Sequence, residues 1–246
     1  MSEMKIALCL SGQPRYFKSG YEQIKKVILD VYDVDCFVHT WWDSSFENTQ
    51  MEFSPQLTYG RKYVWEKDTL ELIKNLYSPK KILSEKQIEF KTFDWCNYGL
   101  CTPMNLHSMF YSIMMSNNLK KKYEESENFK YDVVIRCRFD INFKNYKLNL
   151  NTIDLDRLNA FTIRPSPLGY PIINDQFAVS SSQIMDIYSD VYTNLEKYST
   201  SNEFGAFVGE GVLSHHLYNN NVKFYSLGNT ADSPTSPNAI ISILMK

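Results

Sequence analysis

The first forty residues of the chain constrain its fold most strongly. Residues 5–10 (Lys-Ile-Ala-Leu-Cys-Leu) form a short apolar run that ends in a polar turn, and residues 34–39 form a second apolar run. Between these two runs, apolar side chains recur at the spacing of a helix, namely Tyr21, Ile24, Val27, Ile28 and Val31. A strand, a loop, a helix and a second strand in this order predict a βαβ unit and a parallel sheet.

The rest of the chain continues to alternate between strands and helices. The expected strands are residues 80–83, 131–143, 160–164, 176–180 and 223–227. The expected helices begin at Asp68, at Thr102 followed by Pro103, at Ser181 or Ser182, and near Glu210. Residues 43–66 read as a long loop, and residues 228–238 as an irregular tail. We therefore expect one α/β domain over residues 1–246, with a mixed, mostly parallel sheet flanked by helices.

Composition and charge argue against several classes of protein. A net charge of −2 over 246 residues provides no basic field for a nucleic-acid partner or an anionic membrane. No apolar stretch approaches the roughly 20 residues of a transmembrane helix, and the N-terminus lacks the layout of a secretory signal. Five cysteines without a Cys-x-x-Cys pair predict a reduced, cytoplasmic protein without a structural zinc.

The strand expected over residues 131–143 carries the most informative polar side chains. Because side chains alternate along a strand, Arg138, Asp140 and Asn142 share one face near its carboxyl end. Guanidinium groups match phosphate oxygens, and a carboxylate beside another oxygen donor suits a hard divalent cation. A structural Arg–Asp ion pair at the edge of the sheet explains the same pattern equally well.

Two polar segments follow the first two strands, and both should lie at the edge of the sheet where α/β proteins bind ligands. These segments contain Ser11, Gly12, Gln13 and Arg15 after the first strand, and His39, Thr40 and Trp41 at the end of the second. We predict that together they form a nucleoside pocket. A plain turn and a structural histidine are the simpler interpretations.

Three further polar features complete the set of candidate residues. Asn105 and Ser108 share a polar stripe on the helix after Pro103, a pattern that a solvent-facing side also produces. Asp175 precedes the strand expected at residues 176–180, and Glu210 begins a helix. Either carboxylate could act as a general base.

Five short segments of the sequence follow one another in a distinctive order along the chain. They are residues 5–15, 36–41, 105–112, 131–140 and 173–177. This order resembles a group of small glycosyltransferase-like proteins found in polysaccharide gene clusters and large viruses, which look like GT-A nucleotide-sugar glycosyltransferases. The resemblance implies a GT-A-like (Rossmann-like) domain with a nucleotide-binding half at about residues 1–142 and an acceptor-side half at about residues 143–246.

The resemblance also implies roles for individual residues. GT-A enzymes use an Asp-x-Asp motif to hold Mn²⁺ or Mg²⁺ against the donor diphosphate, and the matching residues here are Asp140 and Asn142. Because Asn142 replaces the second carboxylate, the need for a divalent cation stays open, and Arg138 or Arg15 could neutralise the diphosphate instead. A late histidine often completes the metal shell in this class, and His216 or His215 is the candidate.

The function implied by the resemblance is transfer of a sugar from a nucleoside-diphosphate sugar to a glycan or another hydroxyl acceptor. Arg138 would stabilise the departing diphosphate, and Asp175 or Glu210 would accept the hydroxyl proton. We favour Asp175, because a partly solvated strand entry keeps it ionised and the helix dipole lowers the basicity of Glu210. The alternatives are a sugar nucleotidyltransferase and a non-catalytic nucleotide- or carbohydrate-binding module.

Overall fold

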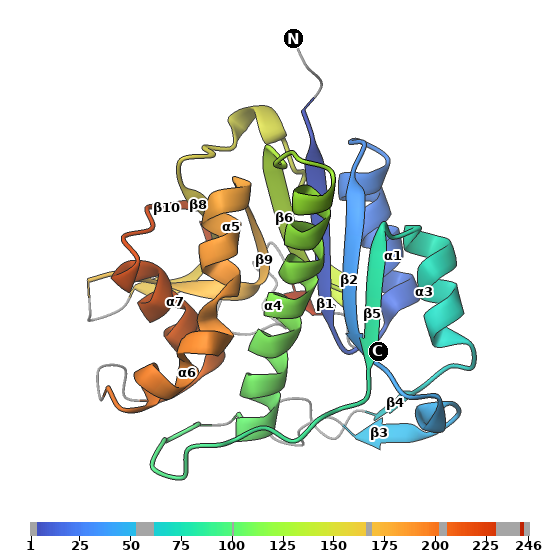
Figure 1. The fold of residues 1–246 in the computed structure, drawn as a ribbon, viewed down its shortest axis with the longest axis horizontal. Coiled ribbons are helices and arrows are strands. Elements are labelled where there is room, and N and C mark those ends of the chain that lie inside the picture. The colour runs from blue at the N-terminus through green and yellow to red at the C-terminus, as the bar shows by residue number, and fades with distance from the viewer. Residues whose placement is uncertain are drawn as a thin grey trace.

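A computed structural model describes residues 4–52, 62–99, 101–165, 169–201, 206–229 and 242–243. They form a single α/β domain around a seven-stranded sheet (Figure 1). Across this sheet the strands follow the order β10-β8-β9-β6-β1-β2-β5. Its members are β1 (Ile6–Gly12), β2 (Asp35–Trp41), β5 (Lys81–Glu85), β6 (Val133–Arg138), β8 (Leu158–Pro165), β9 (Pro171–Ser180) and β10 (Phe224–Asn229).

Six of these strands run in one direction. Strands β5, β2, β1 and β6 pair in parallel, as do β8 and β10, whereas β9 is antiparallel to both of its neighbours. The expected βαβ start and the mixed, mostly parallel sheet are therefore confirmed. Counted along the chain, β5-β2-β1-β6 has the order 3-2-1-4 of a doubly wound sheet, and the order reverses between β1 and β6.

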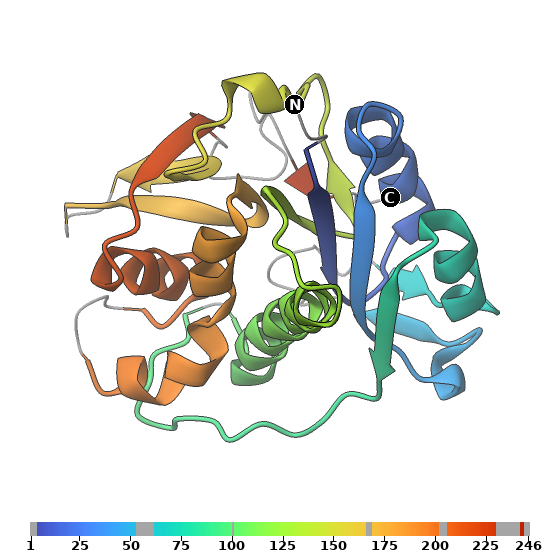
Figure 2. The ribbon, with the colours of Figure 1, turned by 45° about the horizontal axis from the view of Figure 1, so that its top comes forward.

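Helices cover both faces of the sheet (Figure 2). Along β1, Leu8 and Leu10 pack in one core cluster and Ala7 and Cys9 in another, as the period of two requires. The first face carries α1 (Phe17–Ile24), which continues as a π-helix (Lys25–Leu29), and α3 (Thr69–Tyr77). The second carries α4 (Pro103–Ser126), α5 (Ser182–Ser189), α6 (Val191–Ser199) and α7 (Gly209–Asn219).

Short strands and turns lie outside the seven-stranded sheet. Strands β3 (Gln50–Glu52) and β4 (Lys62–Val64) pair antiparallel, as do β7 (Ile141–Asn142) and β11 (Ser242–Ile243). Two 3₁₀ turns lie at Ser44–Phe46 and Leu150–Thr152. The segment expected as a loop over residues 43–66 thus contains strands, although its residues 53–61 lie outside the described part. Of the expected irregular tail, residues 228 and 229 end β10 and residues 230–238 lie outside the description.

Two expected elements are interrupted. The strand expected over residues 131–143 ends at Arg138 and resumes as β7, because the chain turns at Phe139 and Asp140. Helix α1 packs closely on this turn, since a Cβ added to Gly20 would lie 1.6 Å from the Phe139 carbonyl oxygen. The helix expected after Ser181 is two helices, α5 and α6, which meet at Asp190.

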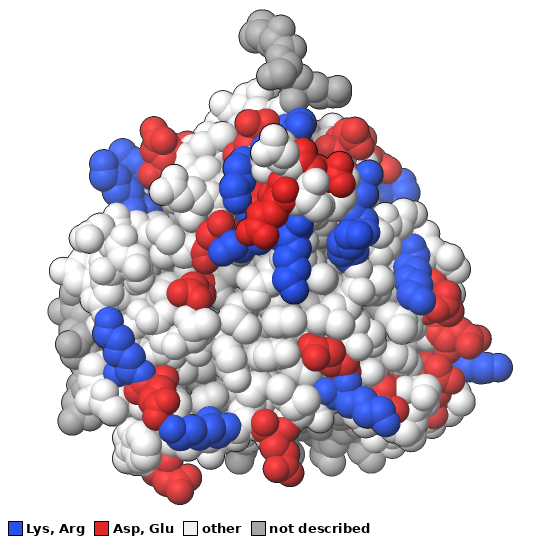
Figure 3. All heavy atoms as spheres, viewed as in Figure 1, with Lys and Arg blue, Asp and Glu red and all other residues white. Residues whose placement is uncertain are grey.

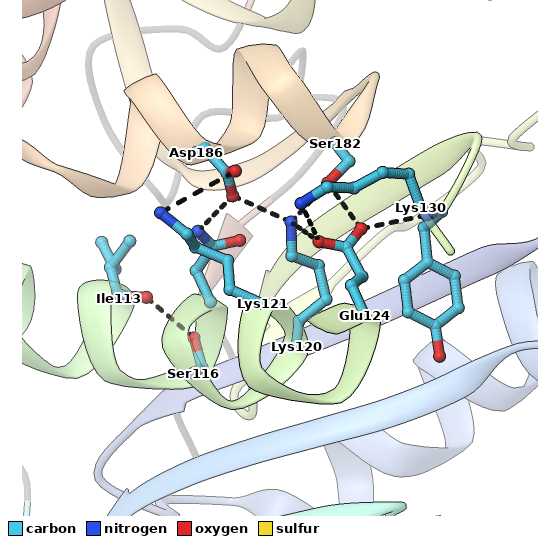
Figure 4. A network of polar contacts seen from close by, with 10 residues as sticks. Ile113, Ser116, Lys120, Lys121, Glu124, Lys130, Ser182 and Asp186 are labelled. Atoms are coloured by element: carbon cyan, nitrogen blue, oxygen red, sulfur yellow. Dashed lines mark hydrogen bonds and ion pairs between the residues drawn. The ribbon is translucent and has the colours of Figure 1, made fainter. Parts of the chain in front are cut away.

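A buried network of charges joins α4 to α5 (Figure 4). The Lys120 ammonium group lies 2.8 Å from Asp186 Oδ1 and 3.4 Å from Glu124 Oε2 and donates a hydrogen bond to Ser182. Glu124 also accepts a hydrogen bond of 2.9 Å from the Tyr131 backbone N–H. Because Lys120 and Glu124 are fully buried, these contacts fix how the two helices sit against each other.

Charge is unevenly distributed over the surface of the protein. Charged side chains of both signs gather around the carboxyl end of α4, and a broad uncharged area lies below them (Figure 3).

Among the described helices, none combines the length and the apolar character needed to cross a bilayer.

Candidate functional site

The centre of the site is an ion pair at the carboxyl end of β6. Arg138 donates from Nε to Asp140 Oδ1 over 2.8 Å and from Nη2 to Oδ2 over 2.9 Å. Arg15, from the loop after β1, brings its Nη2 atom to 3.4 Å from the same Oδ2. Asp140 is only 2% exposed, while both arginine side chains stay partly exposed. Asp140 is therefore buried in the structural ion pair that the sequence also allowed. The two guanidinium groups remain partly exposed at the surface of the site.

Electrostatics favour the charged forms of Asp140 and Arg138. Burial alone would raise the pKa of Asp140, but Arg138 and Arg15 outweigh it and lower that pKa. Burial likewise opposes the charge of Arg138, yet Asp140, with Asp175 and Glu210 further away, raises its pKa above the ordinary value. Arg138 thus lies within electrostatic reach of three carboxylates from three different segments.

Asp175 belongs to an irregular stretch of β9. The pairing with β8 moves from Ala160 opposite Ala178 to Thr162 opposite Ile173, so β9 bulges around Asp175. Such bulges re-aim side chains and are frequent beside active sites. Asp175 is 6% exposed, which corrects the expectation of a partly solvated residue ahead of the strand.

Glycine lets helix α7 approach this bulge. A Cβ added to Gly209, the first residue of α7, would lie 2.9 Å from Met109 Cε and 4.0 Å from Asp175 Oδ2. Glu210 follows in the first turn and is partly buried. Burial, and then the negative charge of Asp175, raise the pKa of Glu210 to about 7, although Arg138 and Arg164 oppose the shift. The backbone N–H at the start of the helix does lower this pKa, in the direction expected from the helix dipole, but burial and Asp175 have the larger effect.

Two residues of the site were missed from the sequence. Cys101 lies within electrostatic reach of both acids: burial first, then Glu210 and Asp175, raise the pKa of its thiol. Arg164, near the end of β8, lies within electrostatic reach of Glu210. Neither belongs to a recognisable motif, and only the folded chain brings them to this edge.

The residues expected at the end of β2 point into the protein. His39 lies between Glu85 Oε2, at 2.8 Å, and Ser112 Oγ, at 2.7 Å. This is a Glu-His-Ser arrangement, but Ser112 is 0% exposed and cannot meet a substrate as a nucleophile. Burial lowers the pKa of His39, although Glu85 opposes this shift, so the ring stays neutral. His39 therefore ties α4 to the sheet.

Thr40, Trp41 and Ser108 serve the same internal packing. Thr40 donates a hydrogen bond of 3.1 Å to the Gly12 carbonyl, and the Trp41 indole donates one of 3.2 Å to the Ser108 carbonyl. The Ser108 hydroxyl donates to Gln87 Oε1 over 3.1 Å. All three residues are buried, so their side chains are not open to a nucleoside in this structure.

The loop after β1 stays at the site. Ser11 pairs with Arg138 near the end of β1, and Gly12, the last residue of this strand, has a φ of 113°, in the region that favours glycine. Gln13 accepts a backbone hydrogen bond of 2.9 Å from Arg15 and is partly buried, whereas Asn105 is exposed at the start of α4.

The three candidate metal ligands do not assemble. Both oxygens of Asp140 contact Arg138, and Asn142 Oδ1 accepts a hydrogen bond of 3.0 Å from the Lys144 backbone. His216 uses its ring nitrogens on Tyr198 Oη and the Ile187 carbonyl, each at 2.7 Å. The alternative, His215, contacts Tyr170 and Asn219. In the described part of the chain, no three His, Cys, Asp or Glu side chains group as a metal site. These residues therefore do not fit a divalent cation.

A cavity of about 510 Å³ lies at the opposite end of the strands. Its lining includes the residues just before β1 and β2 and the aromatic side chains of Tyr123, Phe129 and Tyr131. It is therefore separate from the edge that holds Arg138, and it contains none of the candidate residues.

The sequence matches no protein-family model and no curated protein. We use the name switch-point cluster for the five charged residues that the fold brings together: Arg15, Arg138, Asp140, Asp175 and Glu210. Two partly exposed guanidinium groups can bind an anion there, and a carboxylate with a pKa of about 7 can exchange a proton beside it.

Proposed function

We propose that the protein is a GT-A-type glycosyltransferase that moves a sugar from a nucleoside-diphosphate sugar to a hydroxyl acceptor, such as a glycan. The observation that carries this proposal is the position of the switch-point cluster, at the carboxyl ends of β1 and β6 where the strand order reverses. Open α/β sheets bind nucleotides in the crevice at this point. The 3-2-1-4 order of β5-β2-β1-β6 supports a nucleotide-binding half.

In this proposal, the two arginines receive the charge of the leaving diphosphate. When the bond between the sugar and the diphosphate breaks, negative charge builds up on the diphosphate oxygens. Arg138 and Arg15 can donate hydrogen bonds to those oxygens, Arg138 through the guanidinium hydrogens that do not bind Asp140. Asp140 acts as a positioning residue, because it fixes Arg138 through two hydrogen bonds. No step requires a cation on Asp140.

Glu210 is the proposed general base. A base works best when its pKa lies near the operating pH, and the pKa of Glu210 is raised to about 7. Its carboxylate would take the proton of the acceptor hydroxyl as the oxygen attacks the sugar. Asp175, favoured from the sequence, becomes a positioning residue whose negative charge raises the pKa of Glu210.

The test is a screen of nucleotide sugars for hydrolysis and for transfer to glycan acceptors. The Glu210→Gln variant should lose about 100-fold or more in transfer, with its affinity for the nucleoside diphosphate nearly unchanged. Glu125→Gln, on the exposed side of α4, is the matched control and should transfer normally. Equal transfer by Glu210→Gln and the wild type would remove the assigned base. Absence of both turnover and nucleotide binding would contradict the function.

One observation favours a second candidate, a non-catalytic nucleotide-binding module. Both oxygens of Asp140, the residue at the Asp-x-Asp position, already contact Arg138. A site of this kind could bind a diphosphate without activating it. Tight binding of a nucleoside diphosphate together with no turnover of any nucleotide sugar would select this candidate.

A further inference from the structure

Arg136 is a buried arginine one step below the ion pair on β6. It lies opposite Cys9 of β1 and Ala178 of β9 and is 2% exposed. Because side chains alternate along β6, it shares a face with Val134, which packs in the core beneath α4 and α5, and with Arg138. Arg136 and Arg138 therefore form a column of two guanidinium groups along one strand.

The guanidinium group of Arg136 lacks the partners that a buried charge normally has. Among the residues described, none accepts a hydrogen bond from its Nε or Nη1 atom, and none forms an ion pair with it. Arginine is not deprotonated in proteins. Buried charges are ordinarily paired, because the loss of hydration is otherwise uncompensated. An unpaired guanidinium group at this depth indicates a site for a negatively charged ligand.

The surroundings place Arg136 beneath the switch-point cluster. Burial raises the pKa of the Tyr188 hydroxyl, an effect that Arg136 opposes and Asp175 reinforces, so that hydroxyl lies within electrostatic reach of both. The hydroxyl also donates a hydrogen bond of 3.4 Å to the Asp175 carbonyl. Arg136 is thus close to the bulge of β9 that carries Asp175.

A second unpartnered donor lies beside it. The Oγ atom of Ser11 is buried and, among the described residues, has no hydrogen-bond partner. Ser11 pairs with Arg138, and Cys9 pairs with Arg136, so Ser11 and Arg136 are diagonal neighbours across β1 and β6. A hydroxyl and a guanidinium group that both lack partners can share one anion.

We propose that Arg136 and Ser11 form an inner anion site, which takes the deeper phosphate of a diphosphate ligand while Arg138 takes the outer one. This inference rests on the proposed function, since it assigns the inner contacts of the donor's diphosphate. Two residues on one face of a strand are about 6–7 Å apart at their Cα atoms, and flexible arginine side chains from such positions can both reach one diphosphate. The ligand supplies the counter-charge that Arg136 lacks in the free protein.

The experiment measures the affinity for inorganic pyrophosphate by calorimetry and the melting temperature with and without it. The variant Arg136→Met keeps much of the side-chain volume and removes the charge. We expect it to bind pyrophosphate at least tenfold more weakly. Without the anion it should melt at or above the wild-type temperature, because an uncompensated buried charge has been removed. Pyrophosphate should raise the melting temperature of the wild type more than that of the variant.

Further variants keep the proposal falsifiable if Arg136→Met does not fold. Ser11→Ala removes a single hydroxyl and should weaken pyrophosphate binding several-fold. Arg157→Met, at an exposed ion pair with Asp154, is the control and should bind pyrophosphate as the wild type does. Unchanged pyrophosphate affinity in either Arg136→Met or Ser11→Ala would overturn the inner site and would indicate that internal water satisfies these groups.

Failure of this inference is distinguishable from failure of the proposed function. Pyrophosphate carries neither base nor sugar, so its binding does not depend on sugar transfer. Loss of pyrophosphate binding in Arg136→Met, with no nucleotide sugar turned over by the wild type, would support the anion site and contradict the transferase. Sugar transfer by the wild type, with full pyrophosphate binding in Arg136→Met, would support the transferase and contradict the anion site.

Discussion

Arg138 binds both carboxylate oxygens of Asp140, two residues further along the chain, at 2.8 and 2.9 Å. The pair closes the turn at which β6 ends and holds the guanidinium group at the carboxyl end of this strand. Arg15 contacts the same carboxylate from the loop after β1. One buried acid therefore positions two cationic side chains, one from β6 and one from the loop after β1, which makes its removal the first test of the site.

We expect Asp140→Asn to lower the free energy of unfolding by about 3 kcal/mol, because it leaves two arginines without their counter-charge. The pKa of Asp140 is depressed in the folded protein, so its stabilising effect is present above the unfolded value and is lost as the pH falls below it. Urea unfolding at pH 7 and at pH 3 measures both effects. The control is Asp154→Asn at the exposed Asp154–Arg157 pair, which should change stability by less than about 1 kcal/mol. Equal effects of the two variants would contradict the anchoring role.

The pH dependence of sugar transfer tests the coupling between Asp175 and Glu210. Transfer should rise with pH through about 7 as Glu210 loses its proton. Asp175→Asn removes a negative charge that raises the pKa of Glu210, so the rising limb should move to lower pH. A limb that stays in place in Asp175→Asn, with Asp154→Asn as the reference, would show that Asp175 does not tune the base.

Gly20→Ala tests the contact between α1 and the turn after β6. The new methyl group would lie 1.6 Å from the Phe139 carbonyl oxygen, so α1 or the turn must move. We expect a loss of at least about 3 kcal/mol in the free energy of unfolding. Gly211→Ala, inside α7, meets its nearest atom at 3.6 Å and should be neutral or stabilising by up to about 1 kcal/mol. Similar melting temperatures for the two variants would show that the close contact is not required.

Lys120→Met tests the buried network of Figure 4. It removes the cation between Glu124 and Asp186, so we expect a loss of about 3 kcal/mol. Hydrogen bonds and nearby lysines outweigh burial and lower the pKa of Glu124, so the network should weaken as the pH falls through acidic values. The control, Lys74→Met at the exposed Glu71–Lys74 pair, should cost less than about 1 kcal/mol. Wild-type stability of Lys120→Met would make the network irrelevant to folding.

Local patterns in the sequence were enough to predict much of the frame. The apolar runs predicted β1 and β2, and Thr102 before Pro103 predicted the start of α4, where Thr102 Oγ1 accepts a hydrogen bond of 3.2 Å from the Asn105 backbone. The end of β6 had no local signal: the chain turns at Phe139 and Asp140, where Gly20 of the distant helix α1 packs closely on the Phe139 carbonyl.

The site followed the same division. The placement of Arg15 and Arg138 at one edge follows from the parallel pairing of β1 and β6; the sequence predicted a mostly parallel sheet but did not predict this pairing. The bulge of β9 depends on pairing with β8, so its effect on Asp175 has no local signal. His39 and Trp41 have the residue types of a ligand site, and only their burial under α4 shows that they pack inside.

The most direct measurement is a crystal structure of the protein with a bound nucleoside diphosphate. We expect its phosphate oxygens within hydrogen-bond distance of Arg138 and Arg15, at the carboxyl ends of β1 and β6. Density for the nucleotide in the cavity beside Tyr123, Phe129 and Tyr131, at the amino ends of the strands, would contradict the assignment of the site.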